Sequence, residues 1–231
     1  MPTPLIRIIP TTHPPSTRLL DVMSSLGMGV RHTSRRRTNP AVRALLRTSR
    51  APGSISLITG PSGGGKSTLL RTLHARLVAG GAGCRRIDAP LDDADAGCLL
   101  DALPGDARTA ARCLSAAGLA DAALWARSPR ELSHGEHARF ALALAVSHMT
   151  APQPTTPNVL LWDECASVLD RTTARSVCTS LARFIRRTPS LSLVCATAHD
   201  DVAGWLSPDC TVLCNLSAPP RVLSRLEGRT S

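Results

Sequence analysis

Apolar positions recur along the chain with two different spacings, and the two spacings alternate. Short apolar runs predict buried strands at 54–59, 158–162, 191–197 and 210–216, and another strand is expected at 84–89. Apolar residues three to four positions apart predict helices over 66–78, 106–127, 136–148 and 172–187. Because strands and helices take turns, the pattern predicts an α/β fold, with a mostly parallel central sheet that helices cover on both faces.

The first 50 residues lack this order. They are rich in Pro, Ser, Thr and Arg, and five prolines among the first 15 residues argue against long regular elements there. We therefore expect a basic, partly disordered arm over residues 1–50 and an α/β domain over residues 51–231. Within that domain the stretch 92–101 is acidic and is expected to be exposed, and three prolines mark 151–157 as a loop.

The net charge of +10 is concentrated in the arm. Residues 1–50 contain nine arginines and one acid, Asp21, and they include the basic triplet Arg35–Arg37. A solvated flexible arm, contact with nucleic acid or another acidic partner, and a cleavable organellar targeting segment all agree with this composition. Since the rest of the chain is nearly neutral, only the arm points toward nucleic acid.

Length and cysteine usage set further limits. A chain of 231 residues can bury a sizeable core without disulfides or metal ions. No apolar run approaches the roughly 18 residues of a transmembrane helix, so any contact with a membrane is expected to come through a partner. Eight scattered cysteines form no Cys-x-x-Cys pair. This spacing predicts free, buried thiols in a reducing compartment, the cytoplasm, and it gives no support to a zinc site.

Lys66 is the only lysine among 27 basic residues, and it lies in a glycine-rich segment. The segment matches the pattern G-x-x-x-x-G-K-[ST] of a phosphate-binding loop, between a predicted strand and a predicted helix. Glycines let backbone N–H groups turn toward phosphate oxygens, and the positive end of the following helix attracts the same anion. The residues expected to bind the nucleotide in this loop are Gly60, Pro61, Ser62, Gly63, Gly64, Gly65, Lys66, Ser67 and Thr68.

Four side chains of this region have expected chemical roles, and together they predict MgATP as the ligand. Lys66 is a compact point charge that reaches the β- and γ-phosphates, and Ser67 supplies a hydroxyl to Mg²⁺. An apolar run ends in Asp163 and Glu164. Because ligands bind beyond the carboxyl ends of parallel strands, Asp163 is expected to complete the Mg²⁺ shell. Glu164 is expected to orient or deprotonate the attacking water.

Three further motifs follow in a fixed order. Leu132–Glu136 reads LSHGE, Ser167–Asp170 reads SVLD, and His199 follows a predicted strand. Together with the phosphate loop and the acidic pair, they resemble the ATP-binding cassette ATPases over roughly residues 53–216. LSHGE is similar to the LSGGQ signature of that family, SVLD to its D-loop, and His199 to its switch histidine. The run 163–174 looks more like soluble cassette ATPases related to those fused to acetyltransferase domains, although no segment of acetyltransferase size is present.

The resemblance implies a mechanism in which two cassettes pair head to tail around ATP. Ser133 and Gly135 of one copy would contact the γ-phosphate held by the other copy's phosphate loop, and Asp170 of the D-loop is implied to bind nucleotide as well. Hydrolysis, with Glu164 polarising water and His199 contacting the γ-phosphate, would open the dimer. The second subunit is either another copy of this chain or a paralogue. The signature is expected on a reduced helical subdomain at about residues 101–150.

The sequence departs from the family in three places. The only glutamine is Gln153, after the signature, so the coupling-loop position is vacant or replaced, with Asp88 or Asp92 as candidates. No aromatic residue precedes Trp125, so the usual stacking partner of adenine is missing, and an arginine of the arm is the candidate substitute. His134 occupies the position of a signature glycine, where it would crowd the contact with the γ-phosphate.

These observations favour an ATP hydrolase that dimerises around ATP and drives an unidentified partner process, with nucleic acid as one candidate. The ATP-binding subunit of a membrane transporter is an alternative, which the missing coupling glutamine disfavours. A switch that binds ATP with little turnover is another, which the intact Glu164 disfavours.

Overall fold

The computed structural model describes residues 7–11, 15–32, 39–87, 97–150 and 158–224. The chain divides into two compact units, Met1–Asn39 and Pro40–Ser231. The second unit therefore begins at Pro40, eleven residues before the start expected from composition. The reason is α2 (Pro40–Thr48), an amphipathic helix that buries Ala41, Val42 and Leu45 in the core of the larger unit.

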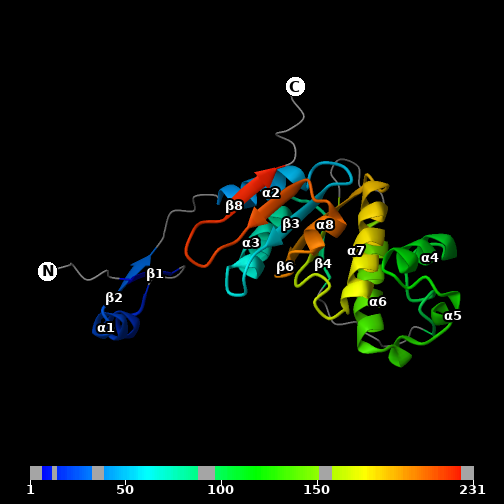
Figure 1. Ribbon diagram of the computed structural model, residues 1–231, viewed down its shortest axis with the longest axis horizontal. Coiled ribbons are helices and arrows are strands. Elements are labelled where there is room, and N and C mark those ends of the chain that lie inside the picture. Colours follow the sequence, from blue (N-terminus) through cyan, green and yellow to red (C-terminus); the bar gives the residue numbers. More distant parts are fainter. Residues whose placement is uncertain (1–6, 12–14, 33–38, 88–96, 151–157, 225–231) are drawn as a thin grey trace, which may run out of the picture. The chain divides into compact units, whose positions relative to one another are not determined.

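The smaller unit is a strand, a helix and a strand. β1 (Arg7–Thr11) pairs in parallel with β2 (Met28–His32), and α1 (Thr17–Ser25) lies between them in the sequence (Figure 1). Parallel pairing requires such a crossover, because a tight turn can join only antiparallel strands. The hydroxyl of Ser16 caps α1 by accepting a hydrogen bond from the N–H of Leu19 at 3.3 Å. The basic triplet at 35–37 lies outside the described residues.

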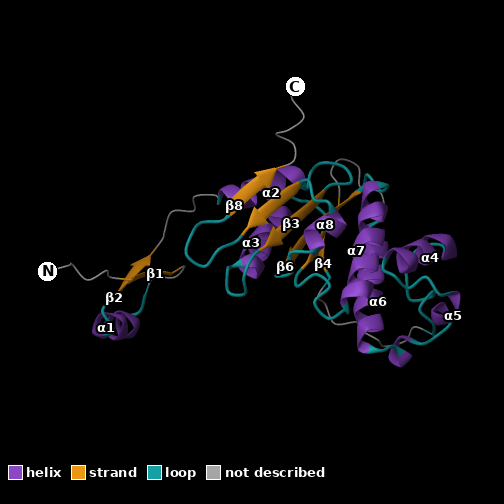
Figure 2. Cartoon of the chain, in the orientation of Figure 1, coloured by secondary structure: helices purple, strands orange, loops and turns teal. Residues whose placement is uncertain are grey.

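The larger unit is built on a six-stranded sheet, seen in orange in Figure 2. In spatial order the strands are β4 (Cys84–Arg86), β5 (Asn158–Trp162), β6 (Leu191–Thr197), β3 (Ile55–Thr59), β7 (Cys210–Leu213) and β8 (Arg221–Ser224). The first five strands are parallel, and β8 runs antiparallel to β7. The expected α/β fold with a mostly parallel sheet is confirmed.

Helices cover both faces of this sheet. Alternate residues of each strand point to opposite faces, so Leu57 joins one hydrophobic cluster and Ile58 the other. The cluster of Ile58 contains α2 and α3 (Lys66–Ala79). The cluster of Leu57 contains α4 (Ala107–Ala116), α6 (His134–Met149) and α7 (Arg171–Arg186). α4 contacts both α6 and α7, and Figure 1 shows α4 and α5 (Ala122–Trp125) on the side of these two helices away from the sheet.

Several elements differ from those that periodicity predicts. The single helix expected over 106–127 is broken after α4 at Gly118, whose φ is +82°. A Cβ there would lie 2.8 Å from a methyl carbon of Val177 on α7, so the chain turns where it approaches that helix most closely. The last predicted strand ends at Leu213, three residues early, and β8 was not predicted.

The cysteines pack as small apolar residues. All eight are free thiols, and six of them are buried, as the sequence predicts. Burial raises the pKa of the Cys165 thiol, which keeps the proton on the sulfur. These thiols therefore contribute to the core and carry no charge near the sheet. No helix among the described residues is long and apolar enough to cross a bilayer.

Candidate functional site

The loop between β3 and α3 has a backbone that glycine makes possible. Gly60, Gly63 and Gly65 have φ values of +138°, +76° and +86°. A Cβ at Gly60 would lie 2.2 Å from the carbonyl oxygen of Cys214, so only glycine lets the loop leave the sheet here. Gly65 caps α3 without a side-chain hydrogen bond, which leaves the first N–H groups of the helix directed at the site. Such a helix start attracts anions.

Lys66 folds back over this loop. Its Nζ donates hydrogen bonds to the carbonyl oxygens of Gly60 and Pro61, each at 2.8 Å. These neutral acceptors hold the ammonium at the rim of the cavity. A phosphate group would offer the ammonium a stronger, charge-assisted partner. The structure therefore places the only lysine of the chain where the sequence predicts it to meet the phosphates.

Ser67 and Asp163 meet across the site. The hydroxyl of Ser67 donates to Oδ1 of Asp163 at 3.1 Å, although the two residues belong to α3 and to the end of β5. The strand order explains the meeting, because β6 alone separates β5 from β3 and all three end at the same edge of the sheet. A hydroxyl and a carboxylate oxygen are the hard ligands that Mg²⁺ prefers. The pair therefore fits the expected Mg²⁺ ion.

Glu164 lies at the rim beside this pair. Its backbone has a φ of +49°, and its N–H donates to Oδ1 of Asp163 at 3.1 Å. A positive φ is uncommon for glutamate and turns the chain sharply as β5 ends. The turn brings the exposed Glu164 to the same cavity as Lys66 and Ser67.

One cavity of about 400 Å³ unites the phosphate loop with the two strand ends. The predicted residues that line it are Ser62, Gly63, Gly65, Lys66, Ser67, Thr68, Asp163, Glu164 and His199. Gly60 and Pro61 lie behind it, where their carbonyls hold Lys66. Sequence reasoning missed Ser167 and Thr197, which also line the cavity. Thr197 Oγ1 accepts from the N–H of His199 at 3.1 Å and so fixes the loop after β6.

The LSHGE segment forms a separate helix start. Ser133 caps α6, and its hydroxyl donates to Oε2 of Glu136 at 2.7 Å, while its N–H donates to the same oxygen at 2.8 Å. These bonds hold the pKa of Glu136 below its usual value, so the carboxylate is ionised at neutral pH. The backbone of Gly135 is held by Arg139, whose Nε donates to its carbonyl at 3.3 Å. Neither Ser133 nor Gly135 lines the cavity of the phosphate loop.

The SVLD segment ends at the start of α7. The carboxylate of Asp170 accepts a hydrogen bond from the N–H of Thr173 at 3.0 Å and so caps that helix. Within one chain Asp170 therefore has a structural partner, and it does not line the cavity. Gly135 of the signature lies close to this segment, because a Cβ there would be 3.6 Å from Leu169. The signature and the SVLD segment thus form one surface beside the phosphate site.

Of the comparisons with known proteins, only the comparison of structures finds matches. No protein-family model matches the sequence, and no curated protein matches it. The dimeric structure of MJ0796, a bacterial ABC transporter cassette, is similar with a TM-score of 0.53 and 18% identity, over 75% of this chain and 86% of that one. The same cassette, dimeric in a post-hydrolysis state with ADP and Pi, gives a TM-score of 0.52 at 18% identity over the same shares. This chain has the fold of an ATP-binding cassette.

A bacterial Atm1-family ABC exporter with ATP bound is similar as well, with a TM-score of 0.53 and 18% identity. The match covers 76% of this chain but only 34% of the exporter, so the shared part is the cassette fold and not the whole protein. The coupling-loop candidates Asp88 and Asp92 lie outside the described residues.

Sequence reasoning missed one contact between two loops that flank the cavity. These loops are the SVLD segment and the loop that contains His199. Arg171 follows the SVLD segment and forms an ion pair with Asp201, two residues after His199, with Nε 3.1 Å from Oδ2. Its guanidinium also stacks over Trp205, 4.8 Å from the ring centroid. The sequence held two signals for this contact: a basic residue, Arg171, directly after the SVLD segment, and an acid, Asp201, two residues after His199.

Proposed function

We propose that this chain is an ATP-binding cassette ATPase that binds MgATP and hydrolyses it. The observation that supports the proposal is the single cavity that Lys66, Ser67, Asp163, Glu164 and His199 share with the glycine-rich loop. A cation, a hard oxygen pair, a candidate base and a histidine are what transfer of a γ-phosphoryl group to water requires.

The residues would act in an ordered way on bound ATP. Lys66 exchanges its two carbonyl partners for β- and γ-phosphate oxygens, and the N–H groups of the loop and of α3 donate to the same phosphates. Ser67 and Asp163 would hold Mg²⁺, which neutralises charge on the phosphates. Glu164 orients a water for in-line attack on the γ-phosphorus and accepts its proton as the bond to the β–γ bridging oxygen breaks. His199 donates a hydrogen bond to the γ-phosphate and stabilises its charge.

The second part of the proposal is that two copies pair head to tail around ATP. Within one chain Ser133, at the start of α6, does not line the phosphate cavity. The N-terminus of α6 is an anion site by its own geometry. A second subunit can bring this helix start to the phosphates, and MJ0796, which shares the fold, has dimeric structures. ATP would then favour the closed dimer because it binds that state better.

Calorimetry and size-exclusion chromatography on the full chain test this function. MgATP should bind with a measurable heat and shift the protein toward a dimer, and steady-state assays should release phosphate. Removal of the metal with EDTA should abolish turnover while leaving weaker nucleotide binding, because the phosphate loop and Lys66 do not depend on the ion. No heat with MgATP would end the proposal, and turnover in EDTA would contradict the role of Ser67 and Asp163.

A transporter subunit is the second candidate, and the structures with the same fold favour it. The matched proteins are a transporter cassette and an exporter. Within the described part of the chain, no helix is long and apolar enough to cross a bilayer. Purification from detergent-solubilised membranes would show a polytopic protein in stable ratio with the chain if the role is real. A nucleic-acid role depends on the arm, and deletion of residues 1–39 should then weaken retention on DNA or RNA at low salt.

The contact of Arg171 with Asp201 and Trp205 leads to a separate prediction. Arg171→Gln should lower kcat about three- to tenfold while the KM for MgATP stays close to that of the wild type, because the contact orients the loops and does not touch the phosphates. Steady-state ATPase kinetics measure both constants. Arg175→Gln is the matched control, since Arg175 lies one turn further along the exposed side of α7 and lines none of the cavities described. An equal loss in both variants would assign the effect to charge on α7 in general.

A further inference from the structure

A second cavity lies between α4 and α7, away from the phosphate loop. It has a volume of about 430 Å³, and four arginines line it together with the hydroxyls of Ser115 and Ser180. Two arginines lie one helical turn apart on α4, and the other two lie one turn apart at the end of α7. They are Arg108, Arg112, Arg183 and Arg187. No aspartate or glutamate lines the cavity, so its charge is strongly positive.

The described part of the chain does not neutralise this charge. Elsewhere in the described part, Arg171 pairs with Asp201 and Arg186 pairs with Asp209, but none of the four arginines forms an ion pair with a described carboxylate. Asp106 lies at the start of α4, and its pKa is lowered mainly by its hydrogen bonds to Thr109 and less by the charge of Arg108. Clustered like charges repel one another, so an anion bound among them is stabilised by all four.

Arg112 is held in place before any ligand binds. Its guanidinium carbon lies 5.9 Å from the centroid of the Phe184 ring, at the edge of cation–π contact. This stacking leaves the N–H groups at the edge of the guanidinium available to a ligand. A guanidinium with a restricted orientation loses less entropy when it binds an oxyanion bidentately.

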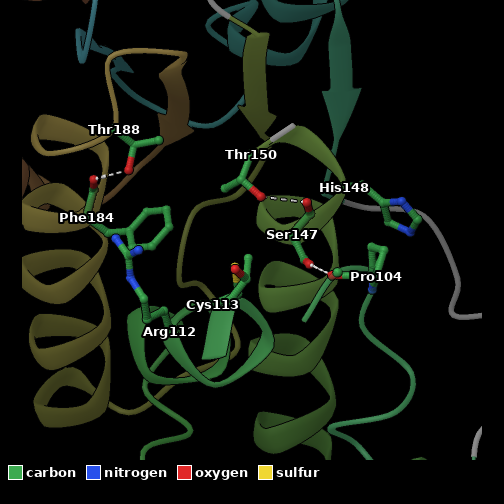
Figure 3. A pocket seen from close by; sticks show the side chains of 10 residues that line it. Pro104, Arg112, Cys113, Ser147, His148, Thr150, Phe184 and Thr188 are labelled. Atoms are coloured by element: carbon green, nitrogen blue, oxygen red, sulfur yellow. Dashed lines mark hydrogen bonds between the residues drawn. The ribbon is translucent and has the colours of Figure 1, made fainter. Parts of the chain in front are cut away.

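A third cavity, of about 440 Å³, adjoins the second and shares Arg112 and Phe184 with it. Figure 3 shows these two residues on one side of the cavity and Ser147 with Pro104 on the other. Three of its hydroxyls already donate to backbone carbonyls: Ser147 to Pro104 at 2.9 Å, Thr150 to Ser147 at 2.7 Å, and Thr188 to Phe184 at 2.9 Å. Each hydroxyl oxygen therefore remains as an acceptor for donors of a ligand.

His148 at the edge of this third cavity adds little positive charge. Burial, and then the nearby charge of Arg85, lowers its pKa, so the ring is neutral at pH 7. The two adjoining cavities thus differ in chemistry. One offers four cations, and the other offers neutral acceptors around an aromatic edge, with the shared Arg112 as its one arginine.

We infer that the two cavities together bind one small phosphorylated molecule. Its phosphates lie among the four arginines, and its uncharged head, which carries N–H or O–H donors, lies among the hydroxyls beside Phe184. Each cavity has the volume of a small-molecule site, and the shared residues let one ligand extend through both. Nucleoside polyphosphates have this combination of groups.

The proposed site is distinct from the phosphate loop. α7 begins beside the SVLD segment at the carboxyl edge of the sheet, and its 16 residues make a helix about 24 Å long. Arg183 and Arg187 lie at its far end, just before β6 begins at the opposite edge. Occupation of this site therefore does not require an occupied phosphate loop.

The test uses the full-length Lys66→Ala variant, in which the phosphate loop is disabled, with ATP and inorganic tripolyphosphate as probes. Calorimetry should still detect ATP binding. Arg112→Gln together with Arg183→Gln should weaken it by at least about tenfold, because each arginine supplies a charge-assisted hydrogen bond. Arg175→Gln on the same helix should leave it unchanged. In the wild-type chain the same titration should give two nucleotides per chain.

Four outcomes would overturn the inference. The first is one nucleotide per wild-type chain with none bound to the Lys66→Ala variant, and the second is residual binding that the double substitution does not weaken. The third is that tripolyphosphate binds as tightly as ATP, which would show that the uncharged head of ATP does not bind in the hydroxyl-lined cavity. A hexaglutamate peptide or a ten-nucleotide single strand that binds more tightly than ATP would likewise assign the cleft to a macromolecule. Since the phosphate loop is disabled throughout, failure here leaves the ATPase proposal intact.

Discussion

Lys66→Ala should lose MgATP binding at the phosphate loop by on the order of a hundredfold or more, and turnover should fall below detection. Lys66 is the only cation whose side chain lines that cavity, so no other residue can replace its contact with the β- and γ-phosphates. Its present partners are the carbonyls of Gly60 and Pro61, which solvent can satisfy once the ammonium is gone. The fold should therefore remain intact. Calorimetry, with thermal unfolding as the check on folding, measures both effects.

Lys66→Arg tests whether the site needs the shape of the lysine side chain as well as its charge. The chain has 26 other basic residues, so cationic side chains are common in it. A guanidinium is a planar fork, too wide to occupy the place of an ammonium between two carbonyls 2.8 Å away. Lys66→Arg should therefore resemble Lys66→Ala in its loss of affinity at the loop. Binding equal to the wild type in Lys66→Arg would show that charge alone is needed and that the lysine has no geometric role.

The elements around the phosphate site could be predicted from the sequence because their signals are local. β3, β5 and β6 are continuous apolar runs, and the residues that carry the chemistry follow them directly. In a parallel sheet such positions converge at one edge. The hydrogen bond from Ser67 to Asp163 joins residues 96 positions apart, yet it was predictable, because each residue occupies a known place relative to its own strand.

The elements that could not be predicted depend on tertiary contacts. α2 lies in a region of Pro and Arg, so its apolar face of Ala41, Val42 and Leu45 was not recognised against that background. The break after α4 arises because Gly118 approaches Val177, a residue distant in the sequence. Neither position carries a signal that local spacing reveals, since the partner that decides the conformation is far away along the chain.

The signature segment contains a negative charge that would oppose the binding of a γ-phosphate. Glu136 places an ionised carboxylate one turn into α6, and it engages the hydroxyl of Ser133. In a head-to-tail dimer that hydroxyl would have to leave Glu136 to donate to a γ-phosphate, and the carboxylate would repel the same phosphate. We therefore expect the ATP-bound dimer proposed for this chain to be weaker than one with a neutral glutamine at this position. Magnesium and Lys66 offset part of the repulsion.

Glu164→Gln should separate nucleotide binding from hydrolysis. The amide has nearly the shape of the carboxylate, so the turn at φ +49° and the N–H contact with Asp163 should persist, and MgATP should still bind. It cannot accept the proton of the attacking water, so kcat should fall by about 10² to 10⁴. ATP would then remain bound long enough for a dimer to accumulate, which size-exclusion chromatography with MgATP can detect.

The control variant is Glu131→Gln. Glu131 is an exposed glutamate outside the cavity, so this variant should behave as the wild type. If Glu164→Gln keeps its turnover, another group accepts the proton; if it binds MgATP but stays monomeric at saturation, the head-to-tail arrangement is wrong for this chain, although the phosphate site stands.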